Sequence, residues 1–259
     1  MMKKFLFIIC SLFSLSTICS ISWALPYCNV NAEFWDNCFG TYEWPSGEFK
    51  RDTYVGEWKN NKKHGQGTYN YLAENEFKGD QYVGEYKNGY VHGQGTYITA
   101  KGNKYVGEFR EGRRNGQFIV SYSNGDKFVG EYKNDIRHSQ GTYIYGPNSE
   151  WAGDKYMGEH KDGERTGLGI YFWADGKKDV GEFKKGKLNG YAIQYNANGT
   201  IDREGIFKDD VFQYTQKKSS TNSNSNSKLN KYKDFCEEIG FTTGTEKFAD
   251  CVLEAMKKD

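Results

Sequence analysis

Three of the four histidines in this sequence stand beside glycine-rich triplets, and both features are used in binding sites. His64 and His92 precede Gly-Gln-Gly, and His138 precedes Ser-Gln-Gly. A cluster of histidines could bind a zinc ion, and a glycine-rich loop that leads into a helix could bind a phosphate group. Which of these functions the residues can perform depends on the elements that carry them.

The histidines share this setting because most of the chain consists of one repeated unit. The units begin 28, 23, 23, 28, 23 and 24 residues apart, and a half unit at 39–53 comes before them. A period of this length is typical of proteins in which each repeat packs on its neighbours. The first residues of the units are Tyr54, Tyr82, Tyr105, Phe128, Tyr156, Asp179 and Arg203.

Each unit has the pattern of a β-hairpin. In residues 82–87, aromatic residues and glycine alternate with valine, glutamate and lysine, which predicts a strand with its rings on one face and its charges on the other. Asn88-Gly89 is a two-residue turn signal, and 92–97 begins the returning strand. Glycine weakens a strand unless a neighbouring ring covers it, so we expect aromatic rings to lie over the glycine column.

The unit YxGExxxGxxHGxGxY, repeated at about 23 residues, resembles the MORN repeat. The resemblance extends from about Phe39 to Asp210. It implies a mainly β fold, an elongated, single-layer, twisted antiparallel sheet of consecutive hairpins with an aromatic-lined groove. Three longer connections share a Glu-aromatic pair followed by Asp52, Asp80 or Asp154, and we expect them to form matching loops at one edge.

This architecture argues against the chemistry considered first. Equivalent residues of consecutive hairpins lie about 9.6 Å apart, two strand spacings, which is too far for the histidines to share a metal ion. A strand pattern follows Gly93-Gln94-Gly95, whereas a phosphate loop requires a helix there. One carboxylate per long loop does not supply the clustered oxygens that calcium needs. The sequence therefore predicts no metal site, no cofactor and no enzyme.

An open sheet with many rings and no catalytic constellation favours binding instead. The leading prediction is a scaffold whose aromatic groove binds a protein or peptide partner, or a second copy of the chain. Rings also stack on sugars, so binding of cell-wall carbohydrate through Trp58 or Trp151 is an alternative. The predicted partner-binding groove consists of Tyr54, Trp58, Tyr82, Tyr86, Tyr105, Phe109, Phe128, Tyr132, Tyr156 and Phe183.

The charged face supplies a third candidate surface. Glutamates and basic residues alternate along it, an arrangement typical of a solvated face, but the basic column could also bind anionic lipid headgroups at a membrane surface. That possible lipid stripe consists of Lys59, Lys87, Arg110, Lys133, Lys161 and Lys184.

The first 24 residues have the pattern of a secretory signal peptide. Two lysines precede an apolar segment, and Ser22-Trp23-Ala24 places small residues before a cleavage point. Cleavage there would remove Lys3 and Lys4, leaving 33 of the 35 basic residues against 34 acidic ones. We therefore expect an exported protein that is periplasmic or secreted. Association with the cell envelope is a further alternative. Its near-neutral charge argues against a nucleic-acid partner.

The cysteines and the C-terminal residues complete the predicted organisation. In an oxidising compartment Cys28 and Cys38, and Cys236 and Cys251, are expected to form local disulfides, although crossed pairings remain open. The repeat domain occupies 25–215, a Ser/Asn-rich linker occupies 216–230, and 231–259 is predicted to form a small α-helical hairpin. Within that module Phe248, Cys251, Val252 and Ala255 fall on one helical face. The module resembles a cysteine-bracketed element of exported bacterial proteins.

Overall fold

The computed structural model describes residues 6–7 and 22–215. The predicted linker at 216–230 and the helical module at 231–259, with Cys236 and Cys251, lie outside the described residues. Most of the predicted signal peptide also lies outside them. Strands β1 (Leu6–Phe7) and β2 (Ser22–Trp23) form a separate antiparallel pair. Among the described residues no helix is long and apolar enough to span a membrane.

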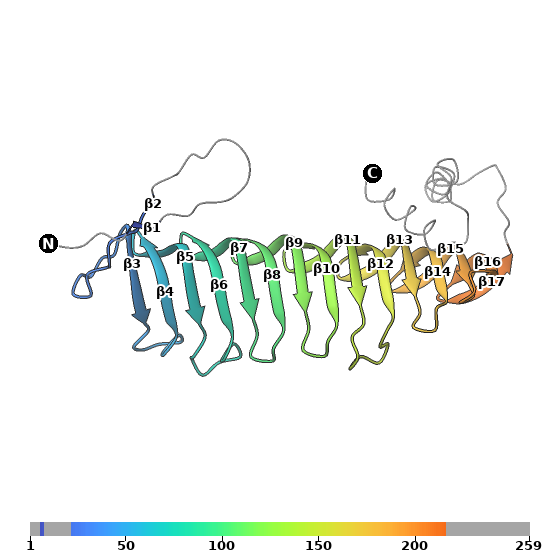
Figure 1. Cartoon of the computed structure of the whole chain (residues 1–259), viewed down its shortest axis with the longest axis horizontal. Coiled ribbons are helices and arrows are strands. Elements are labelled where there is room, and N and C mark those ends of the chain that lie inside the picture. The colour runs from blue at the N-terminus through green and yellow to red at the C-terminus, as the bar shows by residue number, and fades with distance from the viewer. Residues whose placement is uncertain (1–5, 8–21, 216–259) are drawn as a thin grey trace.

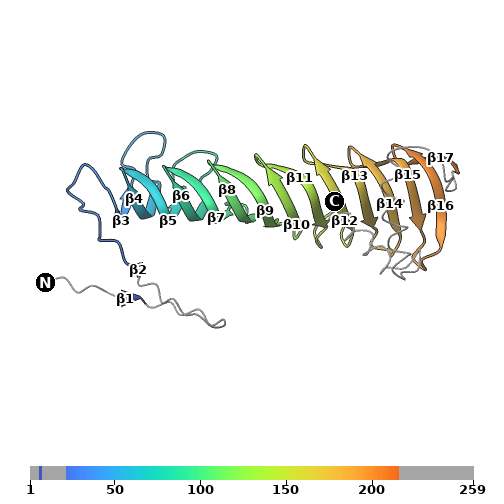
Figure 2. The same ribbon diagram turned by 90° about the horizontal axis from the view of Figure 1, so that it is seen from above.

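The described chain forms one elongated, open, antiparallel sheet of 15 strands, which confirms the mainly β prediction. The strands follow one another in chain order in a single layer (Figures 1 and 2). The first is β3 (Cys38–Glu43), and seven hairpins follow it. They are β4 (Thr53–Lys59) with β5 (Lys62–Asn70), β6 (Gln81–Lys87) with β7 (Tyr90–Ile98), β8 (Lys104–Arg110) with β9 (Arg113–Ser121), β10 (Lys127–Lys133) with β11 (Ile136–Ile144), β12 (Lys155–Lys161) with β13 (Glu164–Phe172), β14 (Lys178–Lys184) with β15 (Lys187–Tyr195), and β16 (Ile201–Lys208) with β17 (Val211–Thr215).

Each hairpin contains a two-residue turn, and the first six share a bulge at the same place. Between β6 and β7, Asn88 and Gly89 both have positive φ, at 54° and 94°, as a tight hairpin turn requires. The register then shifts between Gly84 and Tyr86, opposite Gly93, which has a φ of 57°. The carboxylate of Glu85 occupies the space beside Gly93 and accepts a hydrogen bond of 2.9 Å from the N–H of Gln94. The Gly-Gln-Gly triplet is therefore part of the hairpin geometry.

Rings lie over glycines in four of the hairpins, but these glycines are on the returning strands, whereas the prediction concerned the column on the first strands that includes Gly56 and Gly84. A Cβ atom added to Gly95 would collide with the ring of Tyr82, and the same relation joins three other pairs. These pairs are Tyr54 with Gly67, Phe128 with Gly141, and Tyr156 with Gly169. The four rings have no exposed surface, although the sheet has a single layer, because the rings of neighbouring hairpins pack edge to face against them.

The N-terminal end of the sheet is closed by the segment before β3. Cys28 and Cys38 form a disulfide, which confirms the local pairing for these two cysteines. The N–H of Cys28 donates to the carbonyl of Phe39, so the segment pairs with the outer edge of β3. Trp35 then packs against the ring of Trp58 at a centroid distance of 5.1 Å. The aromatic layer is thereby covered at this end.

Candidate functional site

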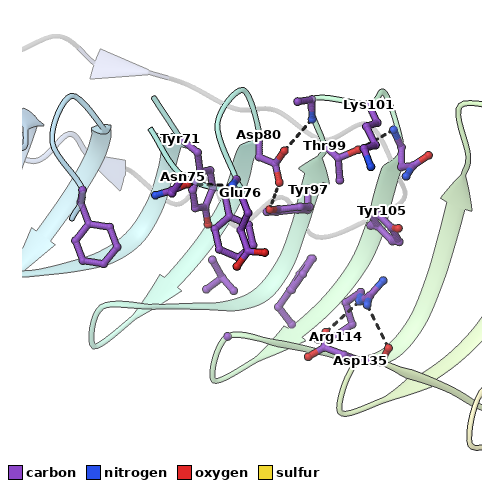
Figure 3. Close-up of a pocket in the computed structure, with 17 residues that line it drawn as sticks. Tyr71, Asn75, Glu76, Asp80, Tyr97, Thr99, Lys101, Tyr105, Arg114 and Asp135 are labelled. Carbon is purple, nitrogen blue, oxygen red and sulfur yellow. Dashed lines mark hydrogen bonds and ion pairs between the residues drawn. The ribbon is translucent and has the colours of Figure 1, made fainter. Parts of the chain in front are cut away.

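A hollow of about 820 Å³ lies on the aromatic side of the second and third hairpins (Figure 3). We call it the aromatic groove and define it by Tyr71, Phe77, Tyr97, Tyr105 and Arg114. The long loop between β5 and β6 supplies the first two residues, β7 supplies Tyr97, and the third hairpin supplies the last two. Val91 and Phe109 also line it. The hollow is therefore open and combines aromatic rings with polar side chains, among them the cations Lys101 and Arg114.

The groove lies at the second hairpin because Val91 is short. Its position, the second residue of the returning strand, carries a long cation in four other hairpins, and that cation lies over a nearby ring. The Lys63 Nζ atom is 4.1 Å from the centroid of Tyr69, and Arg165 Cζ is 4.9 Å from that of Tyr171. Tyr97 is the equivalent ring in the second hairpin, and no cation from the described part of the chain covers it. The residues of this column are Lys63, Val91, Arg114, Arg137, Arg165 and Leu188.

The third hairpin contributes Tyr105 to the aromatic groove because its glycine and covering ring have exchanged strands. The glycine that is covered lies on the first strand, and the ring that covers it lies on the returning strand. The residue opposite Gly107 is Phe118, and the Phe118 ring, instead of that of Tyr105, lies over the glycine. Phe118 is 1% exposed, whereas Tyr105 is only half-buried and lines the groove. Burial and the nearby Tyr122 raise the pKa of Tyr105, so its hydroxyl stays neutral and can donate a hydrogen bond at pH 7.

Arg114 is held in place from both sides at the far wall of the groove. Its guanidinium lies 4.6 Å from the ring centroid of Tyr105 and 4.8 Å from that of Tyr132. Its Nε donates to the carboxylate of Asp135 at 3.0 Å, and a terminal nitrogen donates to the Asp135 carbonyl at 3.2 Å. The side chain keeps 25% of its surface exposed. A fixed, partly solvated arginine of this kind can donate further hydrogen bonds to a bound group.

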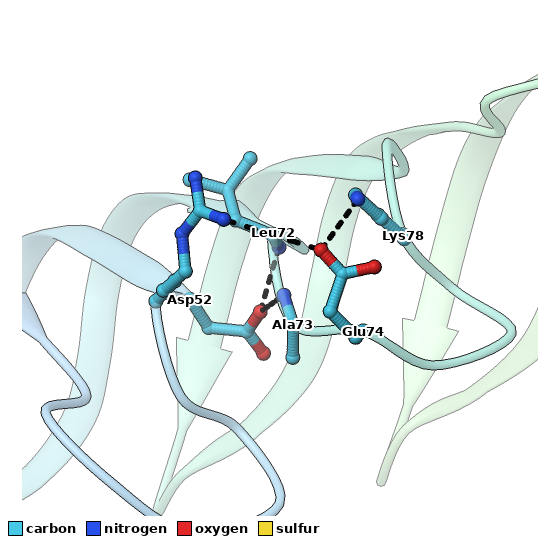
Figure 4. A network of polar contacts seen from close by, with 6 residues as sticks. Asp52, Leu72, Ala73, Glu74 and Lys78 are labelled. Atoms are coloured by element: carbon cyan, nitrogen blue, oxygen red, sulfur yellow. Dashed lines mark hydrogen bonds and ion pairs between the residues drawn. The ribbon is translucent and has the colours of Figure 1, made fainter.

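A buried carboxylate fixes the loops beside the groove. Asp80 accepts a hydrogen bond from the hydroxyl of Tyr97 and another, of 2.8 Å, from the N–H of Ala100. Asp52 makes the same contacts one hairpin earlier, where it accepts from the hydroxyl of Tyr69 at 2.6 Å. It also accepts from the N–H groups of Leu72 and Ala73, both at 2.7 Å (Figure 4). Both oxygens of each carboxylate accept from donors of the neighbouring strand and loop, so these aspartates anchor the loops.

These anchors form a series that the sequence analysis missed in part. Asp126 and Asp154 accept from Tyr143 and Tyr171 in the same way, so each pair has a separation of 17 residues. The third hairpin has Asn103 and Val120 at these positions, so both members of the pair change together. The repeated Asp-x16-Tyr spacing was the signal that could have identified the series.

The histidines occupy separate places along the sheet. His64, His92 and His138 are partly buried, each on its own returning strand, and the described residues contain no group of three histidine, cysteine or acidic side chains able to hold a metal ion. The fourth, His160, takes an aromatic position and packs between Phe128 and Tyr156, at centroid distances of 5.4 and 5.3 Å. Burial, and then the charge of Arg137, lower the pKa of His160 to about 4, so it is neutral at pH 7.

Nine of the ten residues predicted for the partner-binding groove are buried in the aromatic layer of the sheet. All except Tyr105 are at most 7% exposed, because they pack on one another along the sheet. Of the ten, Tyr105 and Phe109 also line the aromatic groove. The accessible rings come mainly from positions that sequence reasoning had not selected, in particular Tyr71 and Tyr97. The buried residues are Tyr54, Trp58, Tyr82, Tyr86, Phe109, Phe128, Tyr132, Tyr156 and Phe183.

The residues of the other two candidate surfaces are placed differently. All six members of the basic column are exposed, and none forms a salt bridge within the described part of the chain. Trp58, which was considered for sugar stacking, is 7% exposed and covered by other rings, whereas Trp151 is 51% exposed. The basic column consists of Lys59, Lys87, Arg110, Lys133, Lys161 and Lys184.

Comparison with known proteins identifies the repeat. The model of the MORN repeat matches six segments, at residues 54–71, 82–104, 105–127, 128–150, 156–178 and 180–201, which together cover more than half of the chain. The seventh hairpin, from Arg203, is not among them. No curated protein sequence matches the chain at a significant level.

Among solved structures, two matches are domains in complexes with peptides. The TCP domain of SAS-4 of Drosophila melanogaster, in complex with a proline-rich motif of Ana2, is 15% identical, with 62% of this chain and 87% of that chain covered and a TM-score of 0.34. The TCP10 domain of Danio rerio CPAP, in complex with a peptide of STIL, is 10% identical, with 64% and 73% covered and a TM-score of 0.33. Similarity at this level carries no inference about a partner.

Proposed function

The chain belongs to the MORN repeat family, and from this premise we propose that it is an exported, non-enzymatic scaffold that binds a segment of a protein partner in the aromatic groove. Repeat sheets of this kind offer a long surface whose shape is set by packing between neighbours. The observation that carries the proposal is the gap over Tyr97, where Val91 replaces the cation that covers the equivalent ring elsewhere.

The composition of the groove fits a peptide or protein ligand. Tyrosine and arginine dominate the binding energy of protein interfaces, because they combine a large apolar surface with hydrogen-bonding groups. Tyr71, Tyr97 and Tyr105 provide the rings, and Arg114 provides donors for a carbonyl or carboxylate of the ligand. The groove is open to solvent along the sheet, which allows an extended segment to enter and leave at its ends.

The sharpest test is to close the groove with a residue that the fold already accepts. Val91→Arg places arginine at a position where Arg137 and Arg165 are native, so we expect it to cover Tyr97 without unfolding the sheet. Val83→Arg, on the opposite face of β6 where Val83 is 42% exposed, is the matched control. A photo-crosslinker is placed at Tyr105 in cells that express the protein, and the attached polypeptide is identified by mass spectrometry.

The expected result is one dominant adduct that Val91→Arg removes and Val83→Arg retains. An adduct that forms equally in both variants would mean that the partner does not occupy the groove. Failure to trap any polypeptide with the control variant would also contradict the proposal.

The exposed basic column supports a second candidate function, attachment to an anionic membrane surface. Its six cations repeat about every 9.6 Å along the sheet, two strand spacings, and face solvent without salt-bridge partners among the described residues. The test is cosedimentation with vesicles that contain an anionic lipid, at low and high salt. Binding that is absent at low salt, or that persists in a variant with Lys87, Arg110 and Lys133 changed to glutamine, would remove this candidate.

A further inference from the structure

The face opposite the aromatic groove changes from polar to apolar in the fifth and sixth hairpins. One column on the returning strands runs Gln66, Gln94, Gln117, Gln140, Leu168, Tyr191, and the next runs Thr68, Thr96, Ile119, Thr142, Ile170, Ile193. Val180 of β14 pairs with both Ile170 and Ile193. We call Leu168, Ile170, Val180, Tyr191 and Ile193 the apolar patch. Its side chains are contiguous across β13, β14 and β15, because cross-strand partners share a face.

The apolar patch is buried, although equivalent residues elsewhere are exposed. Ile170 is 0% exposed and Ile193 is 3% exposed, whereas Ile119, in the same column, is 57% exposed. Val180 is 6% exposed, compared with 47% for Val129 at the equivalent position of β10. Every described strand from β3 to β17 belongs to the one sheet, so the described residues provide no second layer over this face.

We propose that residues 231–259 of the same chain dock on the apolar patch. The chain leaves the sheet at Thr215, the end of β17, two strands from β15 and four from β13. At about 4.8 Å per strand the patch lies within about 20 Å of β17, and the fifteen residues 216–230 can span up to about 50 Å. The docked segment carries apolar residues at helical spacing, Phe248, Val252 and Ala255, which suit an apolar sheet face.

This intramolecular contact is independent of the aromatic groove, which lies on the other face and near the other end of the sheet. It gives a reason why both columns become apolar together in the fifth and sixth hairpins. It also predicts that the sheet and the segment remain associated after the chain between them is cut.

The experiment uses the full chain with a protease site inserted within 216–230. After cleavage the protein is passed over a size-exclusion column without reductant. The test variant is Leu168→Gln, Ile170→Thr and Ile193→Thr combined, because glutamine and threonine occupy these columns in earlier hairpins and the sheet tolerates them there. The matched control is Ile119→Thr, in the same column but exposed. Circular dichroism and light scattering establish that each variant is folded and in which oligomeric state.

We expect the released segment to co-elute with the sheet in the wild type and in Ile119→Thr, and to elute separately in the triple variant. Separation in the wild type would overturn the proposal. So would co-elution in a folded triple variant. A wild-type dimer that the triple variant converts to a monomer, with a segment that already separates, would show instead that a second copy covers the patch.

Discussion

The ring of Tyr82 in β6 fills the space that a Cβ atom on Gly95 of β7 would occupy. This relationship recurs along the sheet and allows a single layer to bury rings completely. We expect Gly95→Ala to lower the free energy of unfolding by about 2 kcal/mol, because the ring must move from its place. Urea unfolding followed by circular dichroism measures the change.

The sixth hairpin provides the comparison for this prediction. There Ala192 occupies the glycine position opposite Gly181, and Asp179 replaces the ring. Ala192→Gly should lower the free energy of unfolding by no more than about 1 kcal/mol, the usual backbone cost of glycine in a strand. If Gly95→Ala lowers the free energy of unfolding by no more than this, the position of the Tyr82 ring does not depend on the absence of a Cβ atom at residue 95.

The hydrogen bond between Tyr97 and Asp80 should contribute to stability and to the shape of the groove. Tyr97→Phe leaves a buried carboxylate oxygen without its donor, and we expect a loss of about 1 to 2 kcal/mol in unfolding free energy. A double-mutant cycle with Asp80→Asn measures the coupling between the two side chains. Tyr90→Phe is the control, since Tyr90 is 62% exposed, and it should change stability by less than about 0.5 kcal/mol. Additive effects in the cycle would argue against the anchor.

Ser139 offers a stabilising substitution. It occupies the bulge position that is glycine in other hairpins, and its φ of 58° is unfavourable for a residue with a Cβ atom. Ser139→Gly should raise the free energy of unfolding by about 0.5 to 1 kcal/mol, and Gly93→Ser, the reverse change in the second hairpin, should lower it by at least as much. Thermal and urea unfolding of both variants test the sign. Equal stability of all three proteins would contradict the role assigned to the bulge.

Buried His160 should make the sheet less stable in mild acid. Its pKa is about 4 in the folded protein, below its ordinary value of 6.5, so the unfolded chain binds a proton more readily between these pH values. The folded state therefore loses up to about 3 kcal/mol as pH falls from 6.5 to 4. His160→Phe, which restores an aromatic residue to the column, should flatten this part of the stability profile.

The control for the acid profile is His92→Asn, because asparagine occupies the equivalent position at Asn115 and Asn189. This variant removes a histidine that lies outside the aromatic column, so a slope that flattens in His160→Phe but not in His92→Asn assigns the effect to His160. A wild-type slope that persists in His160→Phe would mean that carboxylates alone cause the loss of stability.

Most of the fold could be predicted from the sequence because its determinants are local and repeated. Asn88-Gly89 specifies a tight turn, and the alternation from Tyr82 to Lys87 specifies which face is buried. Seven hairpin units with the same pattern can all pair with their neighbours in the same way, and the result is a single open sheet. The pairing of Cys28 with Cys38 also follows from proximity along the chain.

The site was harder to predict because it depends on departures from the repeat. Comparison of the repeats with one another points to the rings that recur in most units. In a packed layer those are the rings that bury one another. The groove depends on Val91, where a long side chain is missing, and on Phe118, which displaces Tyr105 from its glycine. Contacts between a cation and a ring of the next hairpin, such as Arg114 over Tyr132, also depend on distances between units that no single repeat contains.

The irregular third hairpin has a consequence for how a partner would be aligned. On a strictly periodic sheet a bound segment could shift by one unit, about 9.6 Å, and meet the same residues again, so several frames of binding would have equal affinity. Phe118, Val120 and Asn103 interrupt the series of rings, glycines and aspartates at one place. They give the first five hairpins an origin, from which positions along that part of the surface can be counted.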